Sequence, residues 1–214
     1  MMEASSVLEE SLCIEDKDSL ENHFDAPMGI AEAVIFESLD KYHRMFIERS
    51  PFLCIATSDE NGQPTISPKG DAPGFVKIID DKTLIVPDRI GNNKVESFHN
   101  IIENPKVGLI FMVPGIIETL RISGVARIIT DQEKLKFAQV SKNPVKTGLV
   151  VSINQCYFHC GKAVIRSKLW TEEHKIERKD FPSFGKILNE QARLGETIEA
   201  SDLRLNEMYK NEIY

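Results

Sequence analysis

The apolar residues between positions 52 and 153 come in short runs, and these runs constrain the fold more than any other feature of the chain. They are rich in Val, Ile, Leu and Phe, and turn-forming pairs such as Asn61-Gly62, Asp80-Asp81 and Pro114-Gly115 separate them. In one of the runs, apolar and polar residues alternate from Leu120 to Ile129, as in a half-buried strand. The pattern predicts six strands, at residues 52–57, 75–79, 83–86, 107–113, 120–129 and 149–153.

Helices are predicted before, within and after this β-rich stretch. A step of three or four residues between Ile35, Leu39, Tyr42 and Phe46 indicates a helix over 31–49. A helix over 131–140 would be capped by Thr130 in a capping box, and further helices are expected at 160–170, 184–193 and 201–209. Since strands and helices do not alternate strictly, we expect a mainly β protein with α elements, a six-stranded antiparallel barrel with flanking helices, rather than a Rossmann sheet.

Composition narrows the class of protein. With 214 residues, 42% of them hydrophobic, the chain can form one barrel-sized domain, at 31–170, between an acidic arm at 1–30 and a helical tail at 171–214. A formal net charge of -7 argues against nucleic-acid binding, and no apolar run approaches the roughly 18 residues of a membrane span. The start lacks the pattern of a secretion signal, so we expect a cytoplasmic protein with reduced cysteines.

The strongest local signal is the junction at 87–94, where a strand ends and a helix begins. The apolar stripe of Val95, Phe98 and Ile101 places Asn92 or Asn93 at the helix cap and Lys94 in the first turn. A free helix N-terminus attracts anions, and Arg89 and Lys94 would add full charges there. A capped helix with two solvated cations is the alternative, but a lysine in the first turn is unfavourable unless an anion neutralises it.

Two further segments carry polar side chains at suggestive spacing. In an extended segment Ser67 and Lys69 would point to the same side and could hydrogen-bond to a ligand, although a turn carrying polar residues explains them equally well. On a helix Lys162 and Arg166 would share a face next to Trp170, the only tryptophan. The alternative is that Lys162 and Arg166 are simply solvated cations. The same alternative holds for Arg121, on the polar side of the strand predicted at 120–129.

Three potential metal ligands also lie close together in the sequence. Cys156, His159 and Cys160 offer zinc-binding atoms. A structural zinc site needs four ligands, and the chain has no second pair at suitable spacing, so zinc is disfavoured.

The motifs, taken in order, resemble the FMN-dependent subgroup of the pyridoxamine 5′-phosphate oxidase-like split-barrel family. The resemblance covers about residues 36–170. Its segments are 51–58, Thr-Ile-Ser-Pro-Lys-Gly-Asp at 65–71, Leu-Ile-Val-Pro-Asp-Arg at 84–89, Gly-Asn-Asn-Lys at 91–94, 102–111, 118–124 and 156–170.

This resemblance implies a six-stranded split barrel that dimerises, with FMN held in clefts at the subunit interface. By position, Ser67 and Lys69 would lie along the flavin, and Asn92, Asn93 and Lys94 would meet its phosphate. The remaining implied cofactor-binding residues are Val86, Pro87, Asp88 and Arg89 along the ring and ribityl chain, Thr119 and Arg121 on a strand near the flavin, and Lys162, Arg166 and Trp170 in a second wall.

The chain departs from the true pyridoxamine 5′-phosphate oxidases at two motifs. Their Ser-Arg-Lys phosphate segment is Asn92-Asn93-Lys94 here, so one cation is missing and Arg89 would replace it. Their C-terminal Arg-x-His is Arg204-Leu205-Asn206 here, without the histidine. We therefore expect an FMN-dependent oxidoreductase acting on another small molecule. The alternatives are a flavin carrier or sensor without turnover, and a split-barrel protein that uses haem or a deazaflavin.

Overall fold

The computed structural model describes residues 13–26, 29–139, 145–211 and 213, and the chain divides into two compact units, Met1–Ile35 and Phe36–Tyr214. The first unit contains α1 (Lys17–His23) and α2 (Gly29–Ala33). Asp16 caps α1, because its carboxylate accepts a hydrogen bond of 2.7 Å from the backbone N–H of Ser19. The first of these two short helices therefore begins at a local side-chain cap.

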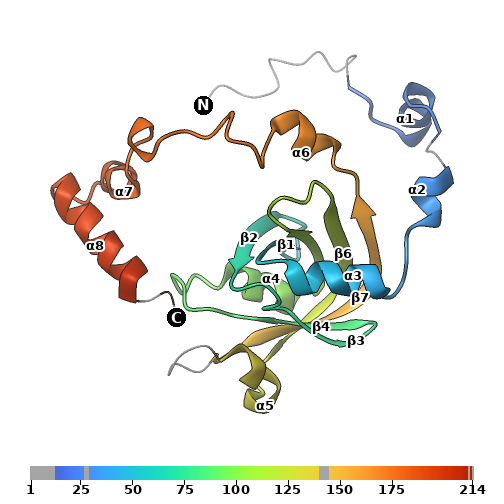
Figure 1. The fold of residues 1–214 in the computed structure, drawn as a ribbon, viewed down its shortest axis with the longest axis horizontal. Helices are drawn as coiled ribbons and strands as arrows, with labels where there is room; N and C mark the ends of the chain where they lie inside the picture. The colour runs from blue at the N-terminus through green and yellow to red at the C-terminus, as the bar shows by residue number, and fades with distance from the viewer. Residues whose placement is uncertain (1–12, 27–28, 140–144, 212, 214) are drawn as a thin grey trace. The chain divides into compact units, whose positions relative to one another are not determined.

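The second unit is built on one antiparallel sheet (Figure 1). Its strands are β1 (Phe52–Ser58), β2 (Pro64–Gly70), β3 (Lys77–Asp80), β4 (Thr83–Pro87), β5 (Lys106–Met112), β6 (Thr119–Ile129) and β7 (Gly148–His159). They follow the order β2-β1-β5-β6-β7-β4-β3, so β2 and β3 are the edge strands of the described sheet. This confirms the mainly β, antiparallel class with flanking helices.

One apolar core lies on the inner side of the curved sheet. Side chains from β1, β4, β5, β6 and β7 meet there with Phe46 and Ile47 of α3 (Lys41–Arg49) and Ile101 of α4 (Glu96–Glu103). Leu53, Ile55 and Phe111 are completely buried. Because inward residues alternate with outward ones along the strands, the periodicity seen in the sequence marks this core.

The sheet has seven strands where the sequence predicts six, and the additional strand is β2. It pairs with β1 through a hairpin at Asn61-Gly62, where Gly62 has a φ of 81° and the Asp59 carboxylate accepts hydrogen bonds from Asn61 and Gln63. Pro64 and Pro68 are tolerated because β2 is an edge strand, whose residues alternate between half-buried and exposed. Its weak apolar pattern explains why the sequence does not mark it as a strand.

The strand predicted at 149–153 is longer than expected, since β7 runs to His159. It pairs with β6 along its whole length, with an irregularity between Ser123 and Gly124. The strand predicted at 75–79 also shifts, to β3 at Lys77–Asp80. The other predicted strands match to within about a residue at each end.

The helix predicted over 31–49 is interrupted and resumes as α3. Phe36 and Cys156 exchange backbone hydrogen bonds of 3.0 and 2.8 Å, which holds the chain extended before the helix. Asp40 then caps α3 by accepting from the N–H groups of Tyr42 and His43. As predicted, the helix ends before Ser50-Pro51.

His43 and Cys156 form a buried contact beneath this helix start. Burial lowers the pKa of His43, while the charge of Asp40 opposes that change. Burial also raises the pKa of the Cys156 thiol to about 11, and the thiol donates to the carbonyl of Ser38. Cys156 therefore serves as a protonated core residue.

An insertion follows β6 and forms α5 (Gln132–Leu135) and the 3-10 helix η3 (Lys136–Ala138). Its cap is Asp131, whose carboxylate accepts from Glu133 and Lys134, rather than the predicted Thr130. Leu135, Ala138 and Val145 pack with Ile85 in a second, smaller core. The last residue of the predicted helix, Val140, lies outside the described residues.

Four elements complete the chain: α6 (Lys162–Ser167), the 3-10 helix η4 (Arg178–Asp180), α7 (Phe184–Ala192) and α8 (Ile198–Asn211). Gly185 of α7 lies close to the backbone of α8 at Ser201 and Asp202, and buried Asn189 donates to Ser201. These two helices correspond to those predicted at 184–193 and 201–209. Within the described ranges, no helix combines the length and the apolar content that a membrane span requires.

Candidate functional site

A cavity of about 490 Å³ lies where β2, the end of β4 and the start of α4 meet. Its size falls within the range of roughly 300–1,000 Å³ that is typical of small-molecule and cofactor sites. Most of the residues that the sequence points to line it, namely Ser67, Lys69, Pro87, Asp88, Arg89, Asn92, Asn93 and Lys94. Two motifs that are separated in the sequence therefore share one cavity.

The N-terminal end of α4 opens on this cavity without a side-chain cap. The helix begins at Glu96, so neither Asn92 nor Asn93 is its cap and Lys94 precedes the first turn, contrary to the sequence prediction. Asn93 and Val95 have positive φ values of 56° and 45°, which displace the helix start toward the C-terminus. Val95, at the cap position, makes no side-chain hydrogen bond to the helix. The Phe98 N–H donates to the Val95 carbonyl at 2.9 Å, so the N–H groups of Glu96 and Ser97 are the first-turn donors that could bind an anion.

Buried polar contacts hold α4 against the β1–β2 hairpin. Asn100 donates hydrogen bonds of 3.0 Å to both Thr57 and Thr65, whose hydroxyls are 2.9 Å apart. Nearer the cavity, the hydroxyls of Ser67 and Ser97 lie 2.8 Å apart. These contacts fix the helix N-terminus beside β2.

Lys69 places a cation on the β2 side of the cavity. Its Nζ lies 2.7 Å from the Asp88 carboxylate and 5.8 Å from the centre of the Phe98 ring. Both members of the ion pair retain some solvent access. Lys94 is far more exposed, and its Nζ lies 3.1 Å from the Glu96 carboxylate. Each lysine thus contacts a carboxylate of this chain, and it could give up that contact to bind a ligand anion instead.

Arg89 lines the cavity, but its guanidinium bonds elsewhere. Its Nε lies 2.5 Å from Asp71 Oδ2, its Nη2 also contacts that oxygen, and its Nη1 donates to the Ala138 carbonyl at 2.6 Å. The Asp71 side chain is almost completely buried, and Asp71 does not line the cavity. The only cation of the 87–91 stretch is therefore already engaged by an acid of this chain.

The remaining implied flavin contacts lie outside this cavity. Val86 is buried in the barrel core, and Thr119 is nearly buried at the start of β6. Arg121 lies over the Tyr157 ring at 5.3 Å, in a separate hollow of about 470 Å³ on the outer face of the sheet. A single chain does not bring these residues into the cavity with Lys69 and Lys94.

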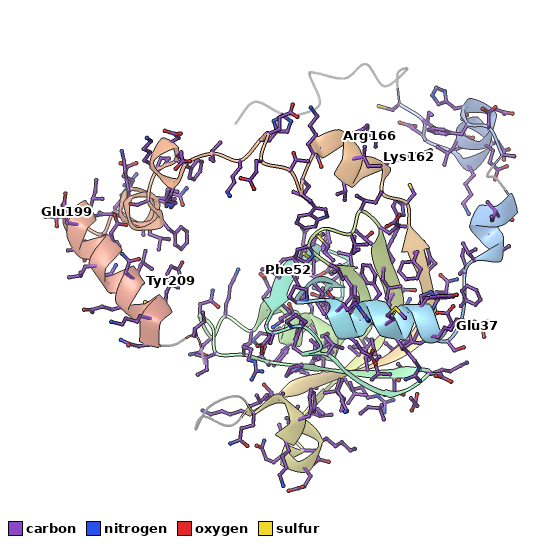
Figure 2. All side chains as sticks on the ribbon, viewed as in Figure 1. Glu37, Phe52, Lys162, Arg166, Glu199 and Tyr209 are labelled. Atoms are coloured by element: carbon purple, nitrogen blue, oxygen red, sulfur yellow. The ribbon has the colours of Figure 1, made fainter. Side chains whose placement is uncertain are left out.

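Lys162 and Arg166 project from α6 (Figure 2). The helix is anchored at both ends, because Gly161 packs on Ile117 and the Trp170 indole donates to the Ile116 carbonyl at 2.8 Å. Neither α6 nor Trp170 lines the first cavity. The three potential zinc ligands that precede α6 do not share one environment, since Cys156 is buried in the core, whereas His159 and Cys160 are exposed.

Several cavity residues were not singled out by the sequence. Phe75, Ser97 and Phe98 contribute side chains to its wall, and Gly70 ends the β2 side. Phe98 belongs to the apolar helix stripe that the sequence shows, but nothing in the local pattern shows that Ser97 meets Ser67. Asp71 ends the Thr-Ile-Ser-Pro-Lys-Gly-Asp segment at 65–71, but no local pattern indicates its contact with Arg89, 18 positions away.

With this geometry established, comparisons with known proteins identify the family. The model of a family described as pyridoxamine 5′-phosphate oxidase matches residues 39–160, more than half of the chain. The chain belongs to the pyridoxamine 5′-phosphate oxidase family. The match spans every strand and both sides of the cavity, and leaves the N-terminal helices and α6 to α8 outside. No curated protein sequence matches the chain.

A comparison with solved structures found the following similarities. HupZ from Group A Streptococcus is 23% identical with a TM-score of 0.47, over 56% of this chain and 93% of its own. A putative pyridoxamine 5′-phosphate oxidase from Lactobacillus delbrueckii is 21% identical with a TM-score of 0.45, over 57% and 95%. An FMN-binding protein from Syntrophomonas wolfei is 18% identical with a TM-score of 0.41, over 55% and 88%.

Proposed function

We propose that this chain binds FMN in the cavity between β2, β4 and α4, and uses it as an oxidoreductase acting on a small molecule. The observation that carries the proposal is the uncapped N-terminus of α4 at the edge of that cavity. A helix N-terminus with free N–H groups binds phosphate, and Lys94 adjoins it. Family membership supports a flavin as the molecule that carries the phosphate.

The chain's own residues would divide the work of binding. Lys94 and the first N–H groups of α4 would hold the phosphate, with Lys94 exchanging its contact with Glu96 for a charge-assisted hydrogen bond. Lys69, paired with Asp88 at 2.7 Å, would supply a positive charge along the ring system. Once bound, FMN supplies the hydride or electron transfer, and the protein supplies position and electrostatics.

A second copy of the chain would complete the site. Arg121, Tyr157 and His159 line the hollow on the outer sheet face, whose floor consists of uncharged residues such as Ala56, Gly108 and Ile110. Arg121 is the only Lys, Arg, Asp or Glu in that lining. A sheet face of this kind suits association of two copies, which would bring residues outside the first cavity to the partner's flavin.

Lys94→Ala tests the phosphate assignment. We expect its FMN dissociation constant to rise about tenfold while that for riboflavin stays the same, because only FMN carries a phosphate and a charge-assisted hydrogen bond is worth about 1.5–3 kcal/mol. Fluorescence titration with both ligands measures the difference, and Lys106→Ala, at an exposed lysine of β5, is the control. Equal affinity of the unmodified protein for FMN and riboflavin would contradict the assignment.

Absorption spectra separate the proposed flavoprotein from its alternatives. The purified protein should show a flavin spectrum, or acquire one when FMN is added. A haem or deazaflavin spectrum would point to another cofactor, and a colourless protein that takes up no FMN would refute the proposal. Reduction by NADH or NADPH followed by reoxidation with an added acceptor distinguishes an enzyme from a carrier or sensor.

A further inference from the structure

Arg89 lies in the wall of the cavity, and its side chain bonds to two other parts of the fold, Asp71 and Ala138. We propose that Arg89 is a positioning residue, which holds the 87–95 wall in its binding conformation, and that it is not a ligand of the phosphate. This inference rests on the proposed function for the identity of the ligand. Its structural part concerns the protein without any ligand.

All three nitrogens of the Arg89 guanidinium contact other residues of the chain. Nε and Nη2 contact the Asp71 carboxylate, with Nε at 2.5 Å, and Nη1 donates to the Ala138 carbonyl at 2.6 Å. The Asp71 side chain is 2% exposed and that of Arg89 is 20% exposed. A carboxylate removed from water to this extent requires a compensating charge, so transferring the guanidinium to a ligand is strongly unfavourable. Lys94, whose side chain is 68% exposed, faces no such restriction.

Both partners of Arg89 are themselves held by other parts of the fold. Asp71 follows β2, its N–H donates to Pro51 at 3.0 Å, and its carboxylate accepts from Ala72 at 2.6 Å. Ala138 lies in η3 and is buried in the second core with Leu135. The wall itself is irregular between β4 and α4, with positive φ at Asn93 and Val95. Arg89 therefore lies near the start of this irregular segment and connects it to both Asp71 and Ala138.

The two possible roles of Arg89, a positioning residue (a brace for the 87–95 wall) and a phosphate ligand, have different consequences for flavin binding. Loss of a brace lowers the fraction of molecules whose wall is ready to bind, and the apparent dissociation constant rises by the same factor for every ligand of the cavity. Loss of a phosphate ligand weakens FMN and leaves riboflavin unaffected. The affinities for these two flavins therefore discriminate between the two roles.

Asp71→Asn provides the test, because Asp71 lies outside the cavity lining and the substitution leaves Arg89 in place. We expect about tenfold weaker binding of both FMN and riboflavin in fluorescence titrations, with Asp25→Asn, at an exposed aspartate of the first unit, unchanged. If Arg89 were a phosphate ligand, releasing it from Asp71 would strengthen FMN binding relative to riboflavin. That result, or a change confined to FMN, would overturn the proposal.

Hydrogen exchange of the flavin-free protein gives a readout that does not depend on the proposed function. Amides of residues 88–95 and 136–139 should exchange faster in Asp71→Asn than in the unmodified chain, whereas Lys94→Ala should leave them unchanged. If Asp71→Asn fails to fold, Arg89→Lys keeps the charge, loses the forked geometry and should give the same two effects. Unchanged exchange in the folded variant refutes the brace. Absence of flavin binding in the unmodified protein refutes only the proposed function.

Discussion

Val95 adopts a left-handed backbone conformation that a β-branched side chain disfavours. Its φ is 45°, and it occupies the cap position of α4 in the lining of the cavity. Backbone strain of this kind tends to persist where the surroundings hold a segment in a functional conformation. Contacts such as those of Arg89 and Asn100 on either side of the segment could supply that restraint.

Replacing Val95 with Asn should relieve this strain. Asn accepts the left-handed conformation more readily, so we expect the free energy of unfolding to rise by about 1 kcal/mol. Little burial is lost, because Val95 is exposed. Urea denaturation measures the change, and the reciprocal variant Asn93→Val, at a φ of 56°, should lower stability by a similar amount. Equal stability of Val95→Asn and the unmodified chain would show that the site is not strained.

At the level of elements, the pairing of β6 and β7 depends on a close approach at Gly124. A Cβ added there would lie 2.1 Å from the Ser152 carbonyl oxygen, next to the irregularity between Ser123 and Gly124. This is the longest strand pairing of the sheet, and it continues into the segment that carries His159 and α6. The absence of a side chain at Gly124 therefore allows the backbones of β6 and β7 to approach each other closely at Ser152.

Gly124→Ala should lower the free energy of unfolding by about 3 kcal/mol or prevent folding, because the clash involves backbone that cannot rotate away. Gly108→Ala on the neighbouring strand β5 is a matched control, since its added Cβ would meet Ala56 at an ordinary 3.9 Å. Chemical denaturation of the two variants provides the comparison. Equal midpoints would mean that β6 and β7 can adjust their separation.

Elements were predictable where their own residues carry the pattern. The run of β6 alternates regularly and that of β5 is almost continuously apolar, so their bounds follow from the sequence to within about one residue. β2 has two prolines and few apolar residues, and it becomes a strand because β1 pairs with it. In the same way, the 34–40 segment leaves the helical pattern because Phe36 bonds to Cys156, a partner far away in the sequence.

For the whole molecule, the proposed association of two copies predicts a dimer in solution. Ile66, at 71% exposure, lies on β2 and lines the outer hollow with Arg121. Ile66→Lys should therefore shift the protein toward the monomer and weaken FMN binding, because it places a charge on the apolar face. Ile79→Lys, at an exposed isoleucine of edge strand β3, should change neither property.

Analytical ultracentrifugation across a range of concentrations measures the mass, with FMN titration on the same samples. A monomeric unmodified protein that binds FMN fully would contradict the proposed role of a second copy. A dimer that survives Ile66→Lys would place the interface on another surface.

The sequence by itself determined the class of fold, the order of motifs and two of the segments that line the cavity, since these follow from short-range periodicity, turn chemistry and residue type. Only the tertiary structure decided what each side chain meets. Arg89 bonds to Asp71 and Ala138, 18 and 49 positions away, and Ser67 meets Ser97, 30 positions away. Such pairings depend on how the sheet curves and where α4 packs. Those features are set by burial of the whole core, and local sequence cannot specify them.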